Sequence, residues 1–322
     1  MIVTVTPNPS LDRTLEVEEL RRGEVVRAHA DRSDPGGKGV NVSRALAANG
    51  YPSRAVLPLG GHDGALLASL LEGLGIEVAA VPIADAIRSN VTVAEPDGTV
   101  TKLNAPGPRL SPAEVDALLE RAVAAADGAG WVVASGSLAP GTPDDLYARL
   151  AAAVRPVGVR VAVDTSGPAL ERALVAGPDV VKPNEEELTE VTGVVPETLG
   201  DVVLAANQLR EKGVGTVLVS LGARGAVLVE DGEAVHAESE VIVPRSTVGA
   251  GDALLAGFLA AGGEGPDALA EGVAWGAAAC VLPGTAVPSP GDLQRQLVQT
   301  HPVDPERSLA LGTDRRRRST HA

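Results

Sequence analysis

The sequence predicts an α/β fold with a mostly parallel central sheet, helices on both faces and a small additional sheet. Short β-branched runs alternate with apolar helical segments along most of the 322 residues, as in sheets whose strands are buried on both faces. Residues 13–34 and 87–104 instead alternate polar with apolar side chains, which is typical of exposed strands. Aromatic residues make up only 2% of the chain, so Val, Leu, Ile and Ala must fill the core.

Composition and charge exclude several classes of protein. The net charge of −15 argues against general nucleic-acid binding, because that activity needs a broad basic surface. The single Cys280 rules out an intramolecular disulfide and fits a reducing compartment. The first residues are strand-like, without a basic n-region, and no apolar run reaches membrane-spanning length. We therefore expect a cytoplasmic protein with neither a membrane nor a nucleic acid as partner.

We expect residues 1–302 to form a single domain, in which segments 13–34 and 87–104 fold as a separate sheet lying over the main sheet as a lid. Residues 303–322 have no such periodicity and include the run Arg315–Arg318, so they predict a flexible basic tail. A lid leaves exposed strand edges, and such edges favour pairing with a second copy. The sequence therefore predicts a homodimer formed through the lid.

Both lid segments carry hairpin signals. Thr14–Val17 and Val25–Arg27 alternate around a Gly-containing turn, and Asp97-Gly98 separates two further alternating runs. Among the cations of these segments are Arg27, Arg88 and Lys102. Each one alone suits a solvated edge strand. Their concentration in the lid of an acidic protein favours an anionic ligand, such as a sugar that already carries phosphate.

The stretch Ser246–Asp252 follows a predicted strand at Val241–Pro244 and opens an apolar helix. Gly249 and Gly251 let the backbone come close to a ligand. The helix N-terminus offers unpaired amides and partial positive charge, so an anion is the expected guest. Asp252 then has two possible roles. It either caps the helix or acts as a base that takes a hydroxyl proton beside a bound phosphoryl group.

A second glycine-rich turn, Pro35–Asn41, opens another helix. Its three glycines surround Lys38 and can wrap a polar ligand, while Asn41 offers both a donor and an acceptor. The turn is not a Walker loop, because Arg32 stands where that motif has its first glycine and no Ser or Thr follows the lysine.

Polar side chains also follow predicted strands at their carboxyl ends, where the ligands of parallel sheets collect. Asp12 follows the first strand and is placed either to hold sugar hydroxyls or to be solvated. Asn184 and Glu187 follow strand Val180-Val181, lie three residues apart on one helical face, and suit the water shell of Mg²⁺. The same acidic run equally suits compensation of the helix dipole.

Two motifs, Gly-Gly-Lys-Gly-Val-Asn at 36–41 and Thr-Val-Gly-Ala-Gly-Asp at 247–252, resemble the two signatures of the PfkB (ribokinase-like) carbohydrate kinases. The resemblance covers roughly residues 1–300. Lys-Pro-Asn-Glu-Glu-Glu and Ser-Leu-Gly-Ala-Arg-Gly lie between the signatures, where that family has its magnesium and nucleotide motifs. Thr6–Asp12 and Thr101–Pro108 resemble the 1-phosphofructokinase and tagatose-6-phosphate kinase branch.

This resemblance implies a ribokinase-like three-layer sandwich that uses ATP and Mg²⁺ to phosphorylate a ketohexose phosphate. Fructose 1-phosphate is the first candidate substrate, and tagatose 6-phosphate and fructose 6-phosphate are the alternatives. The implied catalytic residues are the base Asp252 and an anion hole of Gly249, Ala250 and Gly251. The implied nucleotide-side residues are Lys182, Asn184, Ser220, Gly222, Gly225 and Gly251. The implied sugar-phosphate residues are Asp12, Gly37, Lys38, Asn41, Arg88, Asn104, Ser137, Asp252 and Arg27. The implied magnesium residues, acting through water, are Glu187 and Asn184.

Two details qualify the chemistry. At a helix N-terminus, Asp252 should be a weak base because the dipole favours its anion. Relatives often carry Asn two residues before the glycine of the Gly284-Thr285 loop, whereas this chain has Leu282, which leaves the adenine contacts open.

The sequence speaks against two other functions. A sugar-phosphate sensor on an inactive kinase fold predicts lost catalytic residues, yet Asp252, Asn184 and Glu187 are all present. A dinucleotide-binding dehydrogenase requires Gly-x-Gly-x-x-Gly after the first strand, and this motif is absent there.

Overall fold

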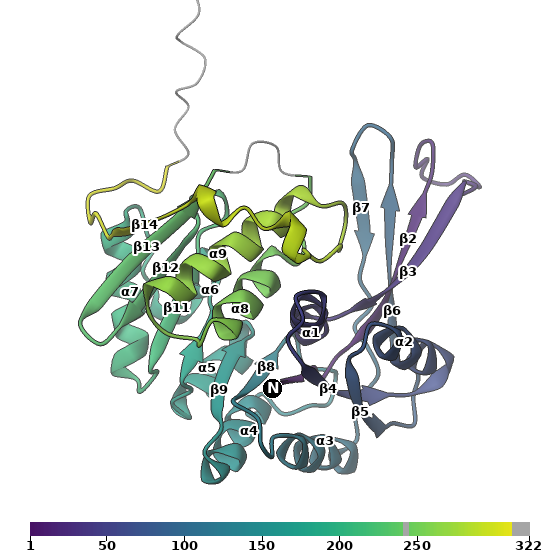
Figure 1. Ribbon diagram of the computed structural model, residues 1–322. Coiled ribbons are helices and arrows are strands. Elements are labelled where there is room, and N and C mark those ends of the chain that lie inside the picture. The colour runs from purple at the N-terminus through teal and green to yellow at the C-terminus, as the bar shows by residue number, and fades with distance from the viewer. Residues whose placement is uncertain (241–244, 311–322) are drawn as a thin grey trace, which may run out of the picture.

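Figure 1 shows the protein as a computed structural model, which describes residues 1–240 and 245–310. In these residues the main sheet has ten strands in the order β14-β13-β12-β11-β10-β9-β8-β1-β4-β5. The strands β11, β10, β9, β8, β1, β4 and β5 are all parallel to one another. Beyond β11, the strands β12, β13 and β14 extend the sheet, and each is antiparallel to the strand before it. The strands are β1 (Ile2–Val5), β4 (Ser53–Leu59), β5 (Glu77–Pro82), β8 (Trp131–Ser135), β9 (Arg160–Asp164), β10 (Val180–Val181), β11 (Thr216–Ser220), β12 (Ala226–Glu230), β13 (Glu233–Ser239) and β14 (Val298–Pro302).

Helices cover both faces of this sheet and form the outer two layers of a three-layer sandwich (Figure 1). One face carries α3 (Pro112–Ala125), α4 (Leu146–Val154), α5 (Gly167–Val175), α6 (Glu185–Thr192) and α7 (Leu199–Glu211). The other carries α1 (Lys38–Ala48), α2 (Gly61–Gly73), α8 (Ala250–Ala260) and α9 (Gly265–Val281). Short 3-10 turns lie at Arg155–Val157, Gly222–Arg224, Pro290–Asp292 and Arg295–Leu297. The predicted α/β class is confirmed.

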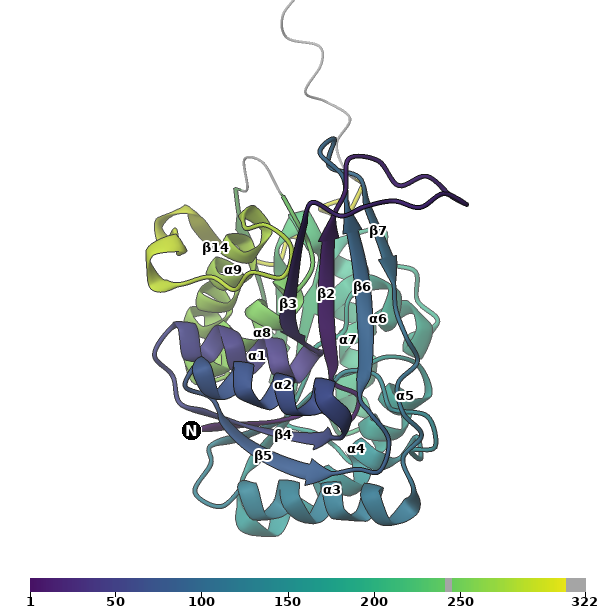
Figure 2. The same ribbon diagram turned by 90° about the vertical axis from the view of Figure 1, so that its right-hand side faces the viewer.

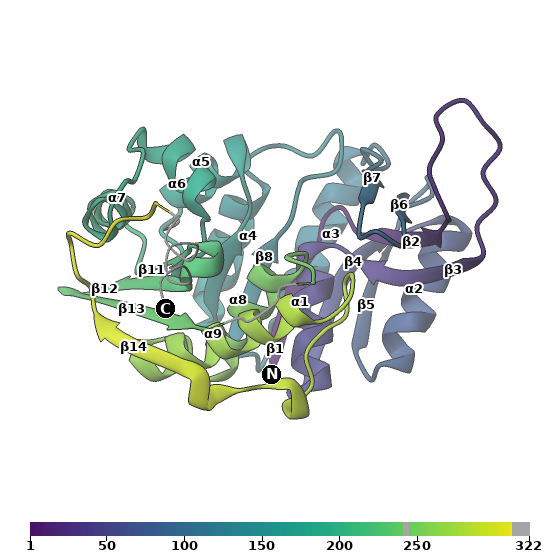
Figure 3. The same cartoon turned by 90° about the horizontal axis from the view of Figure 1, so that it is seen from above.

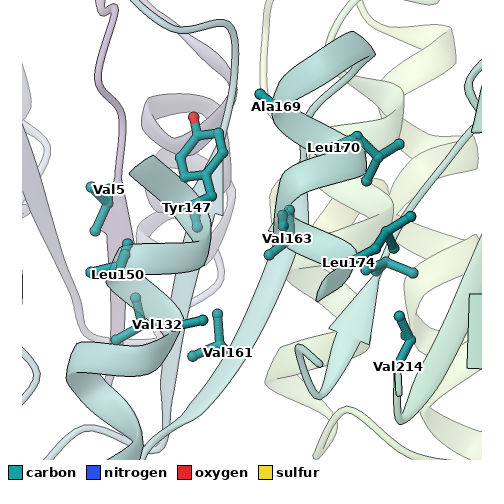
Figure 4. Close-up of a cluster of buried hydrophobic side chains, with 14 of the residues drawn as sticks. Val5, Val132, Tyr147, Leu150, Val161, Val163, Ala169, Leu170, Leu174 and Val214 are labelled. Carbon is teal, nitrogen blue, oxygen red and sulfur yellow. The ribbon is translucent and has the colours of Figure 1, made fainter. Parts of the chain in front are cut away.

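The central strands are apolar on both faces because both faces are covered. Along β8, Val132 packs in the core on the α4 side, whereas Val133 packs in the core on the α8 side. Figure 4 shows the first of these cores, with Val161 and Leu150 close to Val132. The sheet is therefore a rigid platform whose polar groups gather where the parallel strands end.

A second sheet of four strands, in the order β3-β2-β6-β7, stands beside the main sheet as the predicted lid (Figure 2). Its strands are β2 (Ser10–Glu16), β3 (Ala30–Gly36), β6 (Arg88–Ala94) and β7 (Val100–Leu103). The strand expected at Val25–Arg27 is wrong: Val25 is 84% exposed, and residues 17–29 form a loop. Strand β3 ends at Gly36, just before α1, and Gly36 pairs with Ser10 of β2. This register makes the strand begin at Ala30, five residues later than the predicted start at Val25.

The predicted start of the tail, residue 303, is too early in the chain. Residues 303–310 pack on the domain, and Leu309 is only 6% exposed and belongs to the core beside α7. Burial of the Leu309 side chain holds this segment on the domain, although its mostly polar sequence alone predicts a flexible tail. The predicted strand Val241–Pro244 and the run Arg315–Arg318 lie outside the described residues. Among the described helices, none is both long enough and apolar enough to cross a membrane.

Candidate active site

Helix α8 begins at the stretch that the sequence singled out. Gly249 is its N-cap, with a φ of 79°, in the left-handed region that glycine adopts without strain. The amides of the first helical turn have no acceptor within the helix, so they are oriented toward the space before it. Asp252 is the third residue of the helix and is 7% exposed. It is therefore not the N-cap, and the capping role considered for it is wrong.

Asp252 faces helix α1. Its Oδ2 accepts a hydrogen bond of 2.8 Å from Nδ2 of Asn41. The other end of that amide, Oδ1, accepts from Nη1 of Arg44 at 3.3 Å, which orients the donor end toward Asp252. Burial and the nearby Asp164 raise the pKa of Asp252 to about 6, although Asn41 and two lysines act in the opposite direction. The weak base expected from the helix dipole is thus corrected, because burial outweighs the dipole.

Asp164, at the carboxyl end of β9, joins two of the predicted lysines. Its Oδ1 lies 2.7 Å from Nζ of Lys38, and its Oδ2 lies 3.1 Å from Nζ of Lys182. Nζ of Lys38 is also 3.6 Å from Oε1 of Glu187. We call Lys38, Asp164, Lys182, Glu187 and Asp252 the charged cluster.

Opposite charges compensate the burial of this cluster. Burial acts to raise the pKa of Asp164, but Lys182 and Lys38 reverse this and leave its pKa below the usual value. Burial acts to lower the pKa of Lys38, but Asp164 and Glu187 outweigh it and leave its pKa above the usual value. Both groups are therefore charged at neutral pH, and the ammonium groups place positive charge beside Asp164 at the end of β9.

Asn184 and Glu187 form a capping box at the start of α6. Oδ1 of Asn184 accepts from the amide of Glu187 at 2.8 Å, and Oε2 of Glu187 accepts from the amide of Asn184 at 2.9 Å. Ser220, at the end of β11, lies beside Asn184 through a β-bridge. Across the described ranges, no three His, Cys, Asp or Glu residues are grouped to hold a metal ion directly. The other carboxylate oxygen of Glu187 faces the charged cluster.

The turn after β11 contains Gly222 and Gly225. Gly225 has a φ of 80°, and a Cβ added to it would lie 2.0 Å from the carbonyl oxygen of Ala237, so only glycine fits there. A Cβ added to Gly251 would lie 3.3 Å from Nζ of Lys182, which places that ammonium group against the start of α8. The predicted nucleotide-side residues therefore line neighbouring strand ends and the mouth of α8. Leu282 follows at the C-cap of α9.

The lid contributes a separate polar group. Oδ1 of Asp12 accepts hydrogen bonds from Oγ of Ser10 at 2.7 Å and from Nδ2 of Asn90 at 2.9 Å. Arg88 donates to the carbonyl oxygens of Asn8 and Ala105, at 3.0 and 3.2 Å. Burial lowers the pKa of Arg88, and Asp12 opposes this.

Glycines connect the lid closely to the main sheet. A Cβ added to Gly36 would lie 2.3 Å from Oδ2 of Asp12. Gly37, the N-cap of α1 with a φ of 117°, lies so close to Thr6 that an added Cβ would be 2.8 Å from its Cγ2. Because α1 also carries Lys38 and Asn41, this close packing holds the lid beside the charged cluster.

The remaining predicted residues are not gathered into the cluster. Ser137 is exposed and accepts a long hydrogen bond of 3.4 Å from Asn8. Asn104 is exposed just after β7, and Arg27 is exposed in the loop 17–29 at the outer end of the lid. Lys102 is exposed on β7. Of Arg27, Arg88 and Lys102, only Arg88 is partly buried, and it donates to carbonyl groups of the protein.

Comparison with known proteins identifies this arrangement. The profile of the pfkB family carbohydrate kinases matches residues 8–291. The chain belongs to the pfkB family. Its fold and its two glycine-rich helix starts are therefore those of a carbohydrate kinase, and the ribokinase-like fold expected from the sequence is confirmed.

Two curated relatives and one solved structure indicate the branch of the pfkB family. A 1-phosphofructokinase from Rhodobacter capsulatus is 44% identical over 84% of this chain and 86% of its own length. An ATP-dependent 6-phosphofructokinase isozyme 2 from Mycobacterium tuberculosis is 37% identical over 91% of this chain and 88% of its own. The structure of phosphofructokinase-2 from Escherichia coli in complex with substrates and products has a TM-score of 0.85 at 34% identity and covers 92% of this chain and 97% of its own.

Sequence reasoning missed Asp164 and Asn90. Asp164 ends a predicted strand at the carboxyl edge, which was already the position expected to collect ligand residues, so its position was the signal that could have found it. Asn90 gave no such signal. Its place opposite Asp12 depends on the pairing of β2 with β6, and those strands are far apart in the sequence.

Proposed function

We propose that this kinase transfers a phosphoryl group from ATP to fructose 1-phosphate and forms fructose 1,6-bisphosphate. The observation that carries the proposal is the buried carboxylate of Asp252 at the mouth of α8, with a pKa raised to about 6. A base of this kind accepts a hydroxyl proton near neutral pH as the new O–P bond forms. The 44% identity to a 1-phosphofructokinase supports the choice of substrate.

The chain's residues divide the reaction between them. The amides at Gly249, Ala250 and Gly251 bind the charge on the moving phosphoryl group, and Asp252 takes the proton from the acceptor hydroxyl. Lys38 and Lys182 neutralise charge on the phosphate oxygens. Phosphoryl transfer passes through a loose transition state, so this positioning of charge contributes more than the strength of the base.

Lys38 was expected among the residues that hold the sugar phosphate. Its ammonium lies 2.7 Å from Asp164 and 3.6 Å from Glu187, in the same cluster as Lys182 and Asp252. We assign it to the transferred phosphoryl group instead. Asp12, Gly37, Asn41, Arg88, Asn104 and Ser137 are assigned to the sugar phosphate.

The residues present fit magnesium held through water. Glu187 is buried and has one oxygen facing the charged cluster, while its other oxygen and the Asn184 side chain complete the capping box. Mg²⁺ keeps several of its waters and needs only one or two carboxylates besides the phosphates of the nucleotide. Bound there, the ion would neutralise charge on the ATP phosphates. Ser220, Gly222 and Gly225 are assigned to the nucleotide.

Measured turnover distinguishes the candidate substrates. ATP-dependent phosphorylation of fructose 1-phosphate, fructose 6-phosphate, tagatose 6-phosphate and free fructose is compared by kcat/KM. We expect fructose 1-phosphate to be preferred. A preference for fructose 6-phosphate would favour 6-phosphofructokinase activity, which the 37% identical relative supports. A preference for free fructose would contradict the proposal of an anionic sugar substrate.

We also propose that the kinase forms a homodimer through its lid. Several large apolar side chains of the lid are exposed on the single chain: Leu20 at 40%, Val25 at 84%, Val100 at 53% and Leu103 at 60%. Burial against a second lid would remove them from water. Light scattering of the wild type should give the mass of two chains, and Leu103→Ser should shift it toward one. A monomeric wild type would contradict the dimer. The cytoplasmic location also stays a prediction.

A further inference from the structure

The segment after β14, residues 303–310, follows a defined path along the domain, and we call it the C-terminal strap. Figure 3 shows it leaving β14 and turning over the edge of the sheet toward α7 and α6. The amide of Leu199 donates to the carbonyl of Arg307 at 2.9 Å, and the amide of Leu309 donates to the carbonyl of Glu197 at 2.8 Å. Leu309 itself is 6% exposed. The strap is thus attached to the start of α7 by its backbone and to the core by its last apolar side chain.

A salt bridge holds the middle of the strap on β13. Nη1 and Nη2 of Arg307 lie 2.9 and 2.6 Å from the two carboxylate oxygens of Glu238. This hydrogen bonding lowers the pKa of Glu238 against a smaller opposing effect of burial. The bidentate geometry fixes direction as well as distance. The end of the strap is therefore brought to a defined place beside the turn that follows β11.

Arg224 connects the strap to this turn, which we assigned to the nucleotide. Its Nη1 donates to the carbonyl of Leu309, and its Nη2 contacts Oε1 of Glu185. Glu185 is the first residue of α6 and directly follows Asn184. One guanidinium group therefore ties together the strap, the turn and the start of α6.

The backbone of Arg224 is held from the other side. Nε2 of His236, a residue that is 1% exposed on β13, lies 2.7 Å from the carbonyl oxygen of Arg224. Next to it, Gly225 lies directly against the carbonyl of Ala237. The turn is thus held between β13 and the Arg224 side chain, and the side chain supplies the link to α6.

We propose that Arg224 is a positioning residue through which the C-terminal strap holds the turn 221–225 and the start of α6 in their ATP-binding arrangement. The inference rests on the proposed function. A turn held in advance loses little conformational freedom when the nucleotide binds, whereas a released turn must be ordered at that moment. Loss of Arg224 should therefore weaken ATP binding and leave the sugar-phosphate side unchanged.

The test compares Arg224→Ala and Arg224→Lys with a matched control, Arg210→Ala. Arg210 on α7 also binds two backbone carbonyls, those of Gly215 and Glu230, together with a carboxylate. For Arg224→Ala we expect the KM of ATP, and the Kd of a non-hydrolysable ATP analogue measured by calorimetry, to rise by about ten-fold. The KM of fructose 1-phosphate should stay within about two-fold. A lysine side chain reaches only one of the two partners, Leu309 or Glu185. The KM of ATP and the Kd of the analogue for Arg224→Lys should therefore lie between those of Arg224→Ala and the wild type.

The control should lower Tm about as much as Arg224→Ala and change neither KM. A chain ending at Ala310 should match the full chain, and a chain ending at Pro302 should reproduce the Arg224→Ala effect on ATP. An unchanged Kd for the ATP analogue in Arg224→Ala, or an equal rise in both KM values, would overturn the positioning role. Calorimetry separates this from a failure of the proposed function, because a chain that binds the analogue without phosphorylating any ketohexose phosphate still reports the role of Arg224.

Discussion

The charged cluster and the polar face of the lid hold their side chains in different ways. In the cluster, Asp164 is fully buried between Lys38 and Lys182, and its carboxylate is paired with both ammonium groups. On the lid, Asp12 accepts from neutral donors, and Arg88 donates to backbone carbonyls. The cluster is therefore built from mutually dependent charges, whereas the lid is built from separate and partly exposed hydrogen bonds.

Under the proposed function, this difference assigns chemistry to the charged cluster and recognition of the sugar phosphate to the lid. Buried opposite charges keep a fixed field at the ends of rigid strands, which suits stabilisation of a transition state. On the lid, each of these hydrogen bonds joins one charged group to a neutral partner, so it does not depend on a second charge and suits the recognition of a substrate. Substitutions in the cluster should therefore change kcat and stability, and substitutions in the lid should change KM.

The largest effect is expected for Asp252→Asn. Loss of the base should lower kcat by about three orders of magnitude or more, while the Kd of an ATP analogue stays unchanged. Stability should move the other way. The raised pKa of about 6 means that the folded state disfavours the anion, so asparagine should increase the free energy of unfolding above pH 6. This gain should shrink as the pH falls below 6 and should vanish below the ordinary aspartate pKa of 3.8. Near-normal turnover would assign Asp252 a purely structural role.

The second effect is on stability, through Asp164→Asn. This change leaves the ammonium groups of Lys38 and Lys182 without the carboxylate between them, so the free energy of unfolding should fall by about 3–5 kcal/mol. Denaturant unfolding at pH 7.5 measures it. The exposed Asp144→Asn is the control and should stay within about 0.5 kcal/mol of the wild type. Equal stability of the two variants would show that the cluster charges are independent.

A smaller effect is expected on the lid. Arg88→Ala should raise the KM of fructose 1-phosphate by about ten-fold and change kcat by no more than about three-fold. Arg13→Ala on the neighbouring strand is the control, because Arg13 bonds Asp63 of α2 and Ser89, away from Asp12. Steady-state kinetics with ATP in excess measure both variants. A loss of kcat at unchanged KM in Arg88→Ala would contradict the expectation that the lid determines KM and the charged cluster determines kcat.

The smallest effect concerns the contact between α1 and α8. The wild-type kcat should fall below about pH 6 as Asp252 is protonated. The hydrogen bond from Asn41 lowers the pKa of Asp252, so Asn41→Ala should raise that pKa further and move the acid limb to higher pH. The substrate phosphate titrates in the same way with both enzymes. A shift of the acid limb between wild type and Asn41→Ala therefore reports the pKa of Asp252 alone. An unmoved limb would mean that another group controls it.

Much of the fold could be predicted because its signals are local. Alternating β-branched runs and helices gave the main sheet, and the alternating segments gave the lid. The start of β3 could not be predicted, since it depends on the pairing of Gly36 with Ser10. The strap was missed for a similar reason: only the burial of Leu309 against α7 distinguishes it from a polar tail.

The sequence by itself determined the family and the two glycine-rich helix starts, and it predicted Asp252 as the base. The tertiary structure decided the electrostatics around that base. Asp164 meets Lys38 across 126 positions of chain, and Asn41 meets Asp252 across 211. The pKa of Asp252 depends on burial and on charges brought together by the parallel strands, and neither quantity is encoded in any local stretch.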